Sequence, residues 1–474
     1  MEPQIHLADG FPAATREHWQ ALVAKTLKGA GADSLDRTTA DGLVAHAFYD
    51  AHDAPRAARP RPLRPRQGWD VRAFVADPHP ARAHALILEA LAGGASSILI
   101  GLDADQHPGV AVGDADGFSQ LVSGVLTDIA PIALDGGDLG LEAAAWLDAA
   151  VKASPAARLA FHLDPIGAFA LTGVCTTGVS TRTGEAARLA ARLADTYPRA
   201  SLFLATGRVV HEAGGTPAGE IAFAAAAALA YAKALTDAGV SMARAWEGIV
   251  IGLSADAQPM AAIAKMRAAR LVWARLTGAC GLAVPCVIEA RSSGRMLTRA
   301  EPWTNLVRLT CAGFAAGVGG ADAVVLGTHG DAVGTAPDST ALRLARNAQI
   351  ILLEEGHLGR VEDPAGGAWA LEAQTLTLAQ AAWDQFAAIE AQGGLIRALA
   401  SGAVARTVFS ARQRLVLDLA EGRRKILGVT DFAPAAPAPR GKLVGQATGI
   451  DGSAGAGGDR HCPPLTPIRL EDLV

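Results

Sequence analysis

Short apolar segments alternate with amphipathic helical patterns along most of this 474-residue chain. The apolar segments begin near residues 69, 97, 131, 158, 201, 247, 283 and 322, and a helical pattern follows each one. Segments that are apolar on both faces are typical of parallel strands covered on both sides. Eight such units in succession predict a (β/α)8 (TIM) barrel.

An open, doubly wound sheet is the second choice for this pattern. Such sheets usually have fewer strands and a glycine-rich first turn that binds a dinucleotide. The first turn here, at residues 76–80, contains no G-x-G-x-x-G. The sequence therefore gives no support for a dinucleotide site at that turn.

The predicted barrel is flanked by segments of different character. We expect residues 1–66 to form an N-terminal arm, with a helix starting near Thr15 and an Arg/Pro-rich connector at 55–66. The connector is interpreted as an extended, solvated link, and a docking arm for an anionic ligand or a partner is the alternative. The barrel with its following helices is placed at 67–432. An Ala/Pro/Gly-rich tail, flexible or lying on the surface, is placed at 433–474.

Composition and charge exclude several classes of protein. The chain is 50% hydrophobic and 19% charged, as in folded globular proteins. Its net charge of −5 gives no general attraction to nucleic acid or to an anionic membrane. We expect neither a secretory leader nor a transmembrane helix, since no charge-free apolar stretch reaches about 18 residues. The five cysteines form no C-x-x-C pair, which favours reduced thiols over a disulfide frame or zinc site and predicts a cytoplasmic protein.

Catalytic groups of a β/α barrel lie in the loops that follow its strands. We predict a strand at residues 283–288 and a polar loop at 289–299, followed by a helix that opens at Glu301-Pro302 and a strand from Asp322 to Gly327. After that last strand, His329 and Asp331 form a possible acid–base pair. Many unrelated residues occupy such positions, so the pair is the weaker candidate.

Several long motifs, in order, resemble the adenosylcobalamin-dependent acyl-CoA mutases, above all the methylmalonyl-CoA mutase family. They are FPAATREHWQALVAKTLKGA (11–30), MAAIAKMRAARLVWARLTG (260–278), SSGRMLTRAEPWTNLVRLT (292–310), RLARNAQIILLEEG (343–356), RVEDPAGGAWALEAQT (360–375) and GRRKILGVTDF (422–432). The resemblance covers most of residues 10–432. It implies a (β/α)8 barrel that in active members encloses acyl-CoA and is capped by cobalamin.

The chain departs from the active members after the fifth predicted strand. Active members carry Gly-Tyr-His before Glu-Ala-Gly, and their His contacts the substrate carbonyl. Here Arg208 stands in place of the Tyr and Val209 in place of the His. Valine can neither donate a hydrogen bond nor polarise a carbonyl.

A second group of departures lies in the predicted loop at 289–299 and just before it. Active members carry Arg-Thr-His-x-Gln-Thr-Ser-Gly there. Val287 replaces the CoA-facing Arg, Glu289 replaces the His and Arg291 replaces the Gln. We also expect no cobalamin-binding domain after the barrel, because its D-x-H-x-x-G motif does not appear there.

Together these departures are similar to the small (beta), non-catalytic subunit of heterodimeric methylmalonyl-CoA mutases. The resemblance implies no catalytic, cofactor-binding or metal-binding residues in this chain and a homologous catalytic subunit as partner, which holds the adenosylcobalamin. Arg208, Val209, Val287, Glu289 and Arg291 would mark a degenerate former pocket. The alternatives are a catalytic subunit that takes cobalamin from a separate protein, or a repurposed acyl-CoA-binding barrel that uses Arg208 and Arg291 as anionic clamps.

Overall fold

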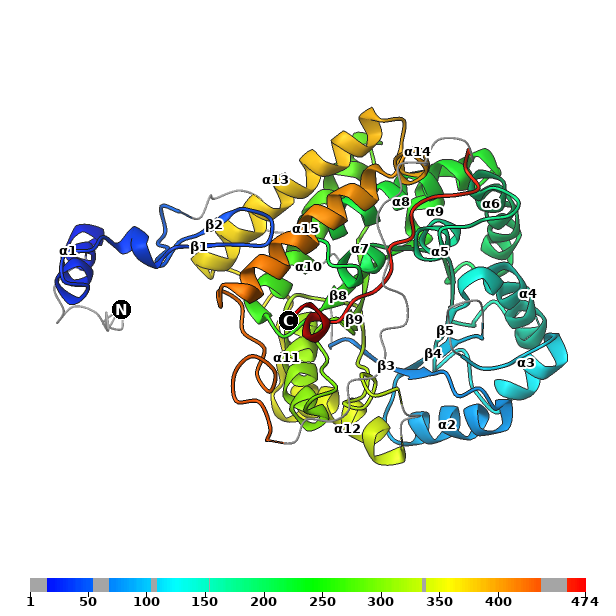
Figure 1. Ribbon diagram of the computed structural model, residues 1–474. Coiled ribbons are helices and arrows are strands. Elements are labelled where there is room, and N and C mark those ends of the chain that lie inside the picture. Colours follow the sequence, from blue (N-terminus) through cyan, green and yellow to red (C-terminus); the bar gives the residue numbers. More distant parts are fainter. Residues whose placement is uncertain (1–14, 54–67, 104–108, 153, 335–337, 436–457) are drawn as a thin grey trace, which may run out of the picture.

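The centre of the molecule is a closed barrel of parallel strands in the order β10-β3-β4-β5-β6-β7-β8-β9 (Figure 1). The computed structural model describes residues 15–53, 68–103, 109–152, 154–334, 338–435 and 458–474. The barrel strands are β3 (Asp70–Val75), β4 (Ser97–Gly101), β5 (Ile132–Asp135), β6 (Leu159–Leu163), β7 (Ser201–Thr206), β8 (Ile249–Ala255), β9 (Val287–Ser292) and β10 (Ala323–Val325). The predicted (β/α)8 barrel is confirmed.

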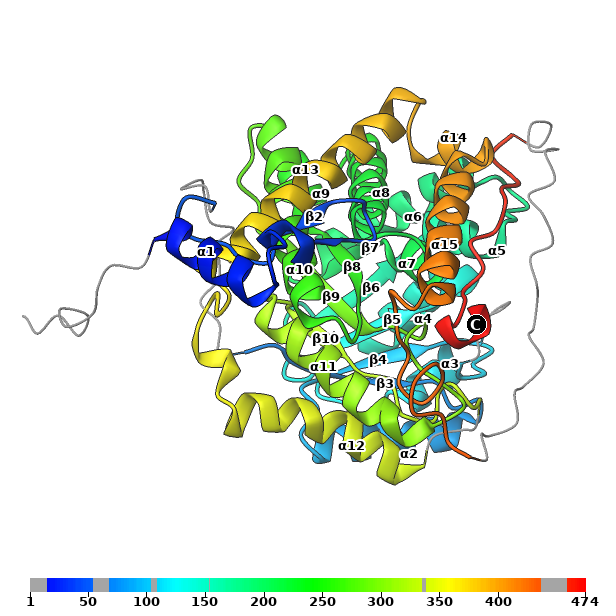
Figure 2. The ribbon, with the colours of Figure 1, turned by 60° about the vertical axis from the view of Figure 1, so that its left-hand side comes forward.

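Helices connect the strands and cover the outside of the barrel (Figure 2). Those between the strands are α2 (Pro80–Ala92), α3 (Ala115–Leu121), α4 (Gly140–Val151), α5 (Pro165–Thr172), α6 (Val179–Thr196), α7 (Arg208–Glu212), α8 (Pro217–Asp237), α9 (Met242–Glu247), α10 (Pro259–Ala279) and α11 (Asn305–Val318). After β10 come α12 (Ser339–Ile350), α13 (Trp369–Ala391), α14 (Leu395–Ala400) and α15 (Ala403–Ala420). Long α13 packs against α8 and α10, so it thickens one side of the helical layer.

The strands divide their side chains between two cores. In β4 every residue is buried, with Ile98 and Ile100 in the large core between strands and helices and Leu99 in a separate small cluster. That cluster lies inside the barrel and contains Leu99, Ala133, Ala160 and Val325, with Phe74 packed against it. Because successive side chains of a strand point to opposite faces, both faces must be apolar, which explains the unbroken apolar runs.

One predicted strand is misplaced. The sequence predicts it at residues 283–288, with a loop from Glu289, but β9 runs from Val287 to Ser292. Pro285 has no N–H for a ladder, so the apolar run before Val287 is a poor central strand. The register instead pairs Val287 with Val250 and carries Glu289 and Arg291 into the barrel wall. The prediction of a loop at these two charged residues is therefore wrong.

The N-terminal arm extends from one side of the barrel (Figure 1). Its helix α1 (Arg16–Thr26) is capped by Thr15, whose hydroxyl accepts a hydrogen bond from the His18 N–H. A turn, η1 (Ala32–Leu35), leads to the arm hairpin, formed by β1 (Arg37–Thr38) and β2 (Val44–Ala45). Asp41 at the hairpin tip accepts a hydrogen bond from the Ala218 N–H at 2.9 Å and so fastens the arm to the barrel. The predicted connector, residues 55–66, lies outside the described part of the chain.

Residues 458–474, which we call the C-terminal segment, cross the carboxyl end of the barrel (Figure 1). Leu465 donates a backbone hydrogen bond to Ala170 after β6, at 2.8 Å, and Ile468 donates one to Glu212 after β7, also at 2.8 Å. Leu470 donates to Arg295 after β9 at 3.0 Å, and Leu465 and Leu470 are both buried. Within the tail predicted at 433–474, residues 436–457 lie outside the described part. The remainder from 458 onward packs on the loops where a barrel carries its chemistry.

Helix α8 is the one described helix long and apolar enough to cross a membrane. It lies in the outer helical layer of the barrel, and 72% of its most apolar window is buried within the protein. Its alanines form part of the main core, from Ala222 through Ala228. This helix is therefore explained by packing within the protein.

Replacing Leu99 tests whether the barrel interior is packed. Leu99 is fully buried in the interior cluster, so Leu99→Ala should lower the free energy of unfolding by about 2–5 kcal/mol in urea titrations. Leu126→Ala is the control, because Leu126 is 63% exposed, and it should change stability by less than about 0.5 kcal/mol. Equal effects of the two substitutions would contradict a packed interior.

Candidate functional site

Five charged or titratable side chains converge inside the barrel from four strands. We call them the lumen network: Arg72 of β3, Asp135 of β5, His162 of β6, and Glu289 and Arg291 of β9. Glu289 and Arg291 lie two residues apart, so both side chains point to the same face of β9. The interior between the strands is thus filled by charged groups together with the small apolar cluster.

Glu289 is the centre of the lumen network. Its Oε2 accepts a hydrogen bond from Arg72 Nη1 at 2.6 Å, and its Oε1 accepts one from Arg291 Nε at 3.2 Å. Arg291 also donates from Nη1 to Asp135 Oδ2 at 2.6 Å, and Arg72 donates from Nε to the Ser97 hydroxyl at 2.9 Å. The chain of contacts therefore joins β3, β4, β5 and β9 across the barrel.

Charge balance keeps the carboxylate and guanidinium groups of the lumen network ionised despite their burial. Burial alone would raise the pKa of Glu289, but His162, Arg291 and Arg72 bring it down to about 2. The pKa of Arg291 is raised, since Asp135 and Glu289 outweigh the effect of burial. A buried carboxylate flanked by two guanidinium groups is a stable anion, and it is not a proton donor or acceptor at neutral pH.

His162 lies beside Glu289 but is too far from it for a hydrogen bond. Its Nδ1 is 3.9 Å from Glu289 Oε2, and neither ring nitrogen makes a hydrogen bond to the described residues. Its backbone is left-handed, with φ of 48°, where the register between β6 and β7 shifts. Burial lowers the pKa of this imidazole to about 4, so it is neutral at pH 7.

Of the five predicted positions, Glu289 and Arg291 are in direct contact. Arg208 begins α7, and burial, and then the like charge of Arg291, lowers the pKa of its guanidinium group. Arg208 Nε is buried without a hydrogen bond to the described residues. Val209 packs against the main core, and Val287 begins β9 at the opposite end from Arg291. The two valines therefore contribute no polar group.

Sequence reasoning does not single out Arg72, Asp135 and His162, which complete the network. Each is a polar residue inside or at the end of an apolar strand segment: WDVRAFV, PIALDG and RLAFHL. That position is a usable signal, because a charge in a fully covered strand needs a partner inside the fold. The partner itself is identified only by the closed barrel.

A second buried network lies outside the lumen, at the carboxyl ends of β7 and β9. His211 Nε2 is 3.0 Å from the Ser293 hydroxyl, and its Nδ1 is 3.3 Å from Glu220 Oε2. Lys265 of α10 pairs with Glu220 at 2.5 Å. The arrangement has the order of a Ser–His–Glu triad, but Ser293 is 0% exposed. A sealed hydroxyl cannot attack a substrate, so we assign this network to packing.

In the other acid–base candidate, His329 and Asp331, the two side chains make separate contacts. The Asp331 carboxylate accepts hydrogen bonds from the Thr328 hydroxyl and N–H. The His329 ring stacks on Trp303 with centroids 4.5 Å apart, and its Nδ1 makes no hydrogen bond to the described residues. The two side chains therefore do not present a paired acid and base.

The described part of the chain also offers no metal site of the usual kind. Among those residues, no three His, Cys, Asp or Glu side chains converge to hold a metal ion. The carboxylates inside the barrel are instead neutralised by arginines, as the pairs of Glu289 with Arg72 and of Asp135 with Arg291 demonstrate.

Comparison with known proteins identifies the family. The family model described as methylmalonyl-CoA mutase matches residues 69–444. The chain belongs to this family. It is 36% identical to the methylmalonyl-CoA mutase small subunit of Streptomyces virginiae, over 91% of this chain and 74% of that protein. It is 37% identical to the probable small subunit of Mycobacterium tuberculosis (strain ATCC 25618 / H37Rv), over 84% of this chain and 66% of that protein. The large subunit of Streptomyces virginiae is 24% identical over 90% of this chain.

Removing the charge of Glu289 should destabilise the fold strongly. Glu289→Gln keeps the side-chain size but leaves two buried guanidinium groups without their shared anion, at a cost of about 3–5 kcal/mol in the free energy of unfolding. Glu185→Gln is the matched control, because Glu185 forms a surface pair with Arg182, and it should cost less than about 0.5 kcal/mol. Urea unfolding of both variants checks this, and a small effect at Glu289 would contradict the network.

His162 should make the protein sensitive to mild acid. Its pKa is about 4 in the fold, against an ordinary value of 6.5. Between these values the unfolded chain binds a proton that the folded chain does not, so stability falls as the pH drops from about 6.5 toward 4. The loss reaches about 3 kcal/mol over that range. In urea titrations from pH 7 to pH 4.5, His162→Gln should lose less stability than the wild type; identical pH profiles would contradict this role.

Proposed function

We propose that this chain is the accessory, non-catalytic subunit of a heterodimeric, adenosylcobalamin-dependent methylmalonyl-CoA mutase. The observation that carries the proposal is the ion-paired state of Glu289 and Arg291. These residues occupy positions where the active members of the family carry His and Gln. Both side chains are bound to other residues of the barrel interior, so neither is available to a substrate.

The residues after β7 support the same proposal. Val209 stands where active members carry the His that contacts the substrate carbonyl, and its partly buried side chain packs against the apolar core. Arg208 is partly buried, and burial, and then the like charge of Arg291, lowers its pKa. Val209 supplies no group that could polarise a thioester carbonyl.

The position of the C-terminal segment also supports an accessory role. It covers loops at the carboxyl end of the barrel, where cobalamin caps the active members of the family. The Arg299 N–H donates to the Glu471 carboxylate oxygens at 2.9 and 3.0 Å, and the Arg299 side chain pairs with Asp472. A cofactor approaching this end would have to displace that segment. We therefore propose that adenosylcobalamin is bound by the partner and not by this chain.

The proposed partner is a homologous catalytic subunit in the cytoplasm. Relatives of this chain are named both small and large subunits, and the large subunit from Streptomyces virginiae aligns with 90% of this chain. The arm supplies a surface for such a partner, because Leu22 of α1, Leu35 and Val44 are about half exposed. Apolar side chains on an extended arm are more stable when a second chain covers them.

Purification and assay of the two chains test this proposal. The full chain alone, supplied with adenosylcobalamin, should not convert methylmalonyl-CoA to succinyl-CoA. Co-expressed with the large subunit, it should co-purify in equal amount with that subunit, and the complex should be active. Isomerisation by the isolated chain, with the large subunit shown to be absent by mass spectrometry, would contradict the non-catalytic role.

A further inference from the structure

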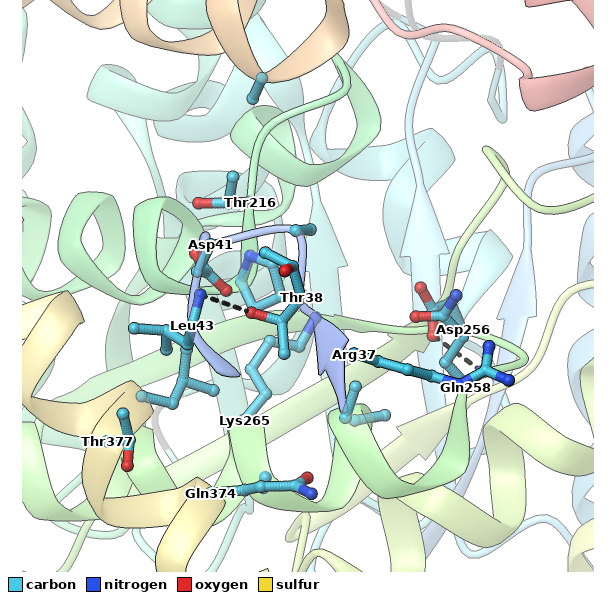
Figure 3. Close-up of a pocket in the computed structure, with 18 of the residues that line it drawn as sticks. Arg37, Thr38, Asp41, Leu43, Thr216, Asp256, Gln258, Lys265, Gln374 and Thr377 are labelled. Atoms are coloured by element: carbon cyan, nitrogen blue, oxygen red, sulfur yellow. Dashed lines mark hydrogen bonds between the residues drawn. The ribbon is translucent and has the colours of Figure 1, made fainter. Parts of the chain in front are cut away.

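A cavity of about 680 Å³ lies outside the barrel lumen (Figure 3). Its walls are the arm hairpin, the loop after β7, α10, α13 and the end of α15 with the turn that follows. Small-molecule sites commonly have volumes of about 300–1,000 Å³. None of the five lumen-network residues lines this cavity, so it is separate from the former pocket.

The carboxylates of the cavity wall are already engaged. Asp41 accepts from the Ala218 N–H, and Asp418 pairs with Arg423 at 2.8 Å. Asp256 accepts from the Gln258 N–H at 3.0 Å and lies 3.8 Å from Arg295. Asp53 pairs with Arg16 at 2.5 Å. Each of these carboxylates thus already has a hydrogen-bond or ion-pair partner within the protein.

Three further arginines line the wall. Among the described residues, no hydrogen bond or ion pair engages the guanidinium groups of Arg37, Arg414 and Arg424, which come from the hairpin, α15 and the following turn. Burial, and then the like charge of Arg295, lowers the pKa of Arg424, while Asp256 and Asp418 act in the opposite direction. Guanidinium groups that converge on a cavity from separate elements form a site for a multiply charged anion.

The rest of the wall can hold an organic group. Leu43 of the hairpin, Leu378 of α13 and Leu415 of α15 line the same cavity, together with the ring of Tyr49. Figure 3 shows the hairpin, with Leu43, lying over Lys265 and near Gln374 and Thr377. A cavity with cationic groups and an apolar wall suits a phosphorylated molecule that carries a ring.

We propose that this cavity binds a phosphorylated organic molecule of nucleotide size, with Arg37, Arg414 and Arg424 on its phosphates. This site is independent of the proposed accessory function, because it uses no residue of the lumen network. Since the hairpin forms one wall, a bound molecule holds the arm against the barrel. The site thereby couples ligand binding to the position of the arm.

Calorimetric titration of the full chain with ADP tests the site. ADP should bind saturably, and Arg414→Ala combined with Arg424→Ala should weaken binding at least tenfold. Arg188→Ala, on the exposed surface of α6, is the matched control and should leave binding unchanged. Adenosine, which lacks phosphate, should bind at least tenfold more weakly than ADP.

Limited proteolysis supplies a readout at the arm itself. ADP should slow tryptic cleavage after Arg37 in the wild-type chain but not in the double variant, with the unfolding temperature of each variant confirming that it is folded. Arg37→Ala gives a third variant on the exposed hairpin, and it should also weaken ADP binding. No saturable binding at millimolar ADP, equal binding of adenosine, or unchanged binding in the folded variants would each overturn the proposal.

Discussion

The contact of two guanidinium groups with the Glu289 carboxylate is the interaction on which the interior of this barrel depends. An unpaired carboxylate at this depth would be protonated or would destabilise the fold. Arg72 and Arg291 prevent this, and Arg291 in turn needs Asp135. Buried ion pairs contribute little net stability compared with apolar packing, but removing one partner is costly. The network therefore persists as a unit, and its members are not free for other chemistry.

This interdependence is consistent with the proposal that the barrel keeps the fold of the mutase family with a changed active site. The strands and helices that carry the family motifs pack through the main apolar core, which contains neither Glu289 nor Arg291. Inside the barrel, Glu289 and Arg291 bind one another, and they also bind Arg72 and Asp135. The C-terminal segment adds backbone hydrogen bonds and buried leucines at the carboxyl end. Packing and chemistry are thus separable in this fold.

The sequence predicts the architecture well because the architecture depends on local patterns. Apolar runs mark the strands, and Thr15 marks the start of α1. The sequence predicts the site less well, because partners such as Arg72 and Glu289 lie 217 residues apart. A single charged residue in a strand does not reveal its partner, because the partner depends on how the closed barrel aligns the strands. The sequence-based prediction misplaces β9 for the same reason. Glu289 and Arg291 resemble loop residues, although their charges are compensated inside the barrel.

Binding of methylmalonyl-pantetheine to the isolated chain tests the central claim most directly. This fragment carries the acyl end that the lumen of an active member would enclose, but it lacks the nucleotide, so the cavity beside the arm does not confuse the result. If the ion pairs fill the lumen, a calorimetric titration should show no saturable binding of this fragment up to millimolar concentration. Stoichiometric binding that Leu99→Ala alters would show an open lumen and would contradict the account.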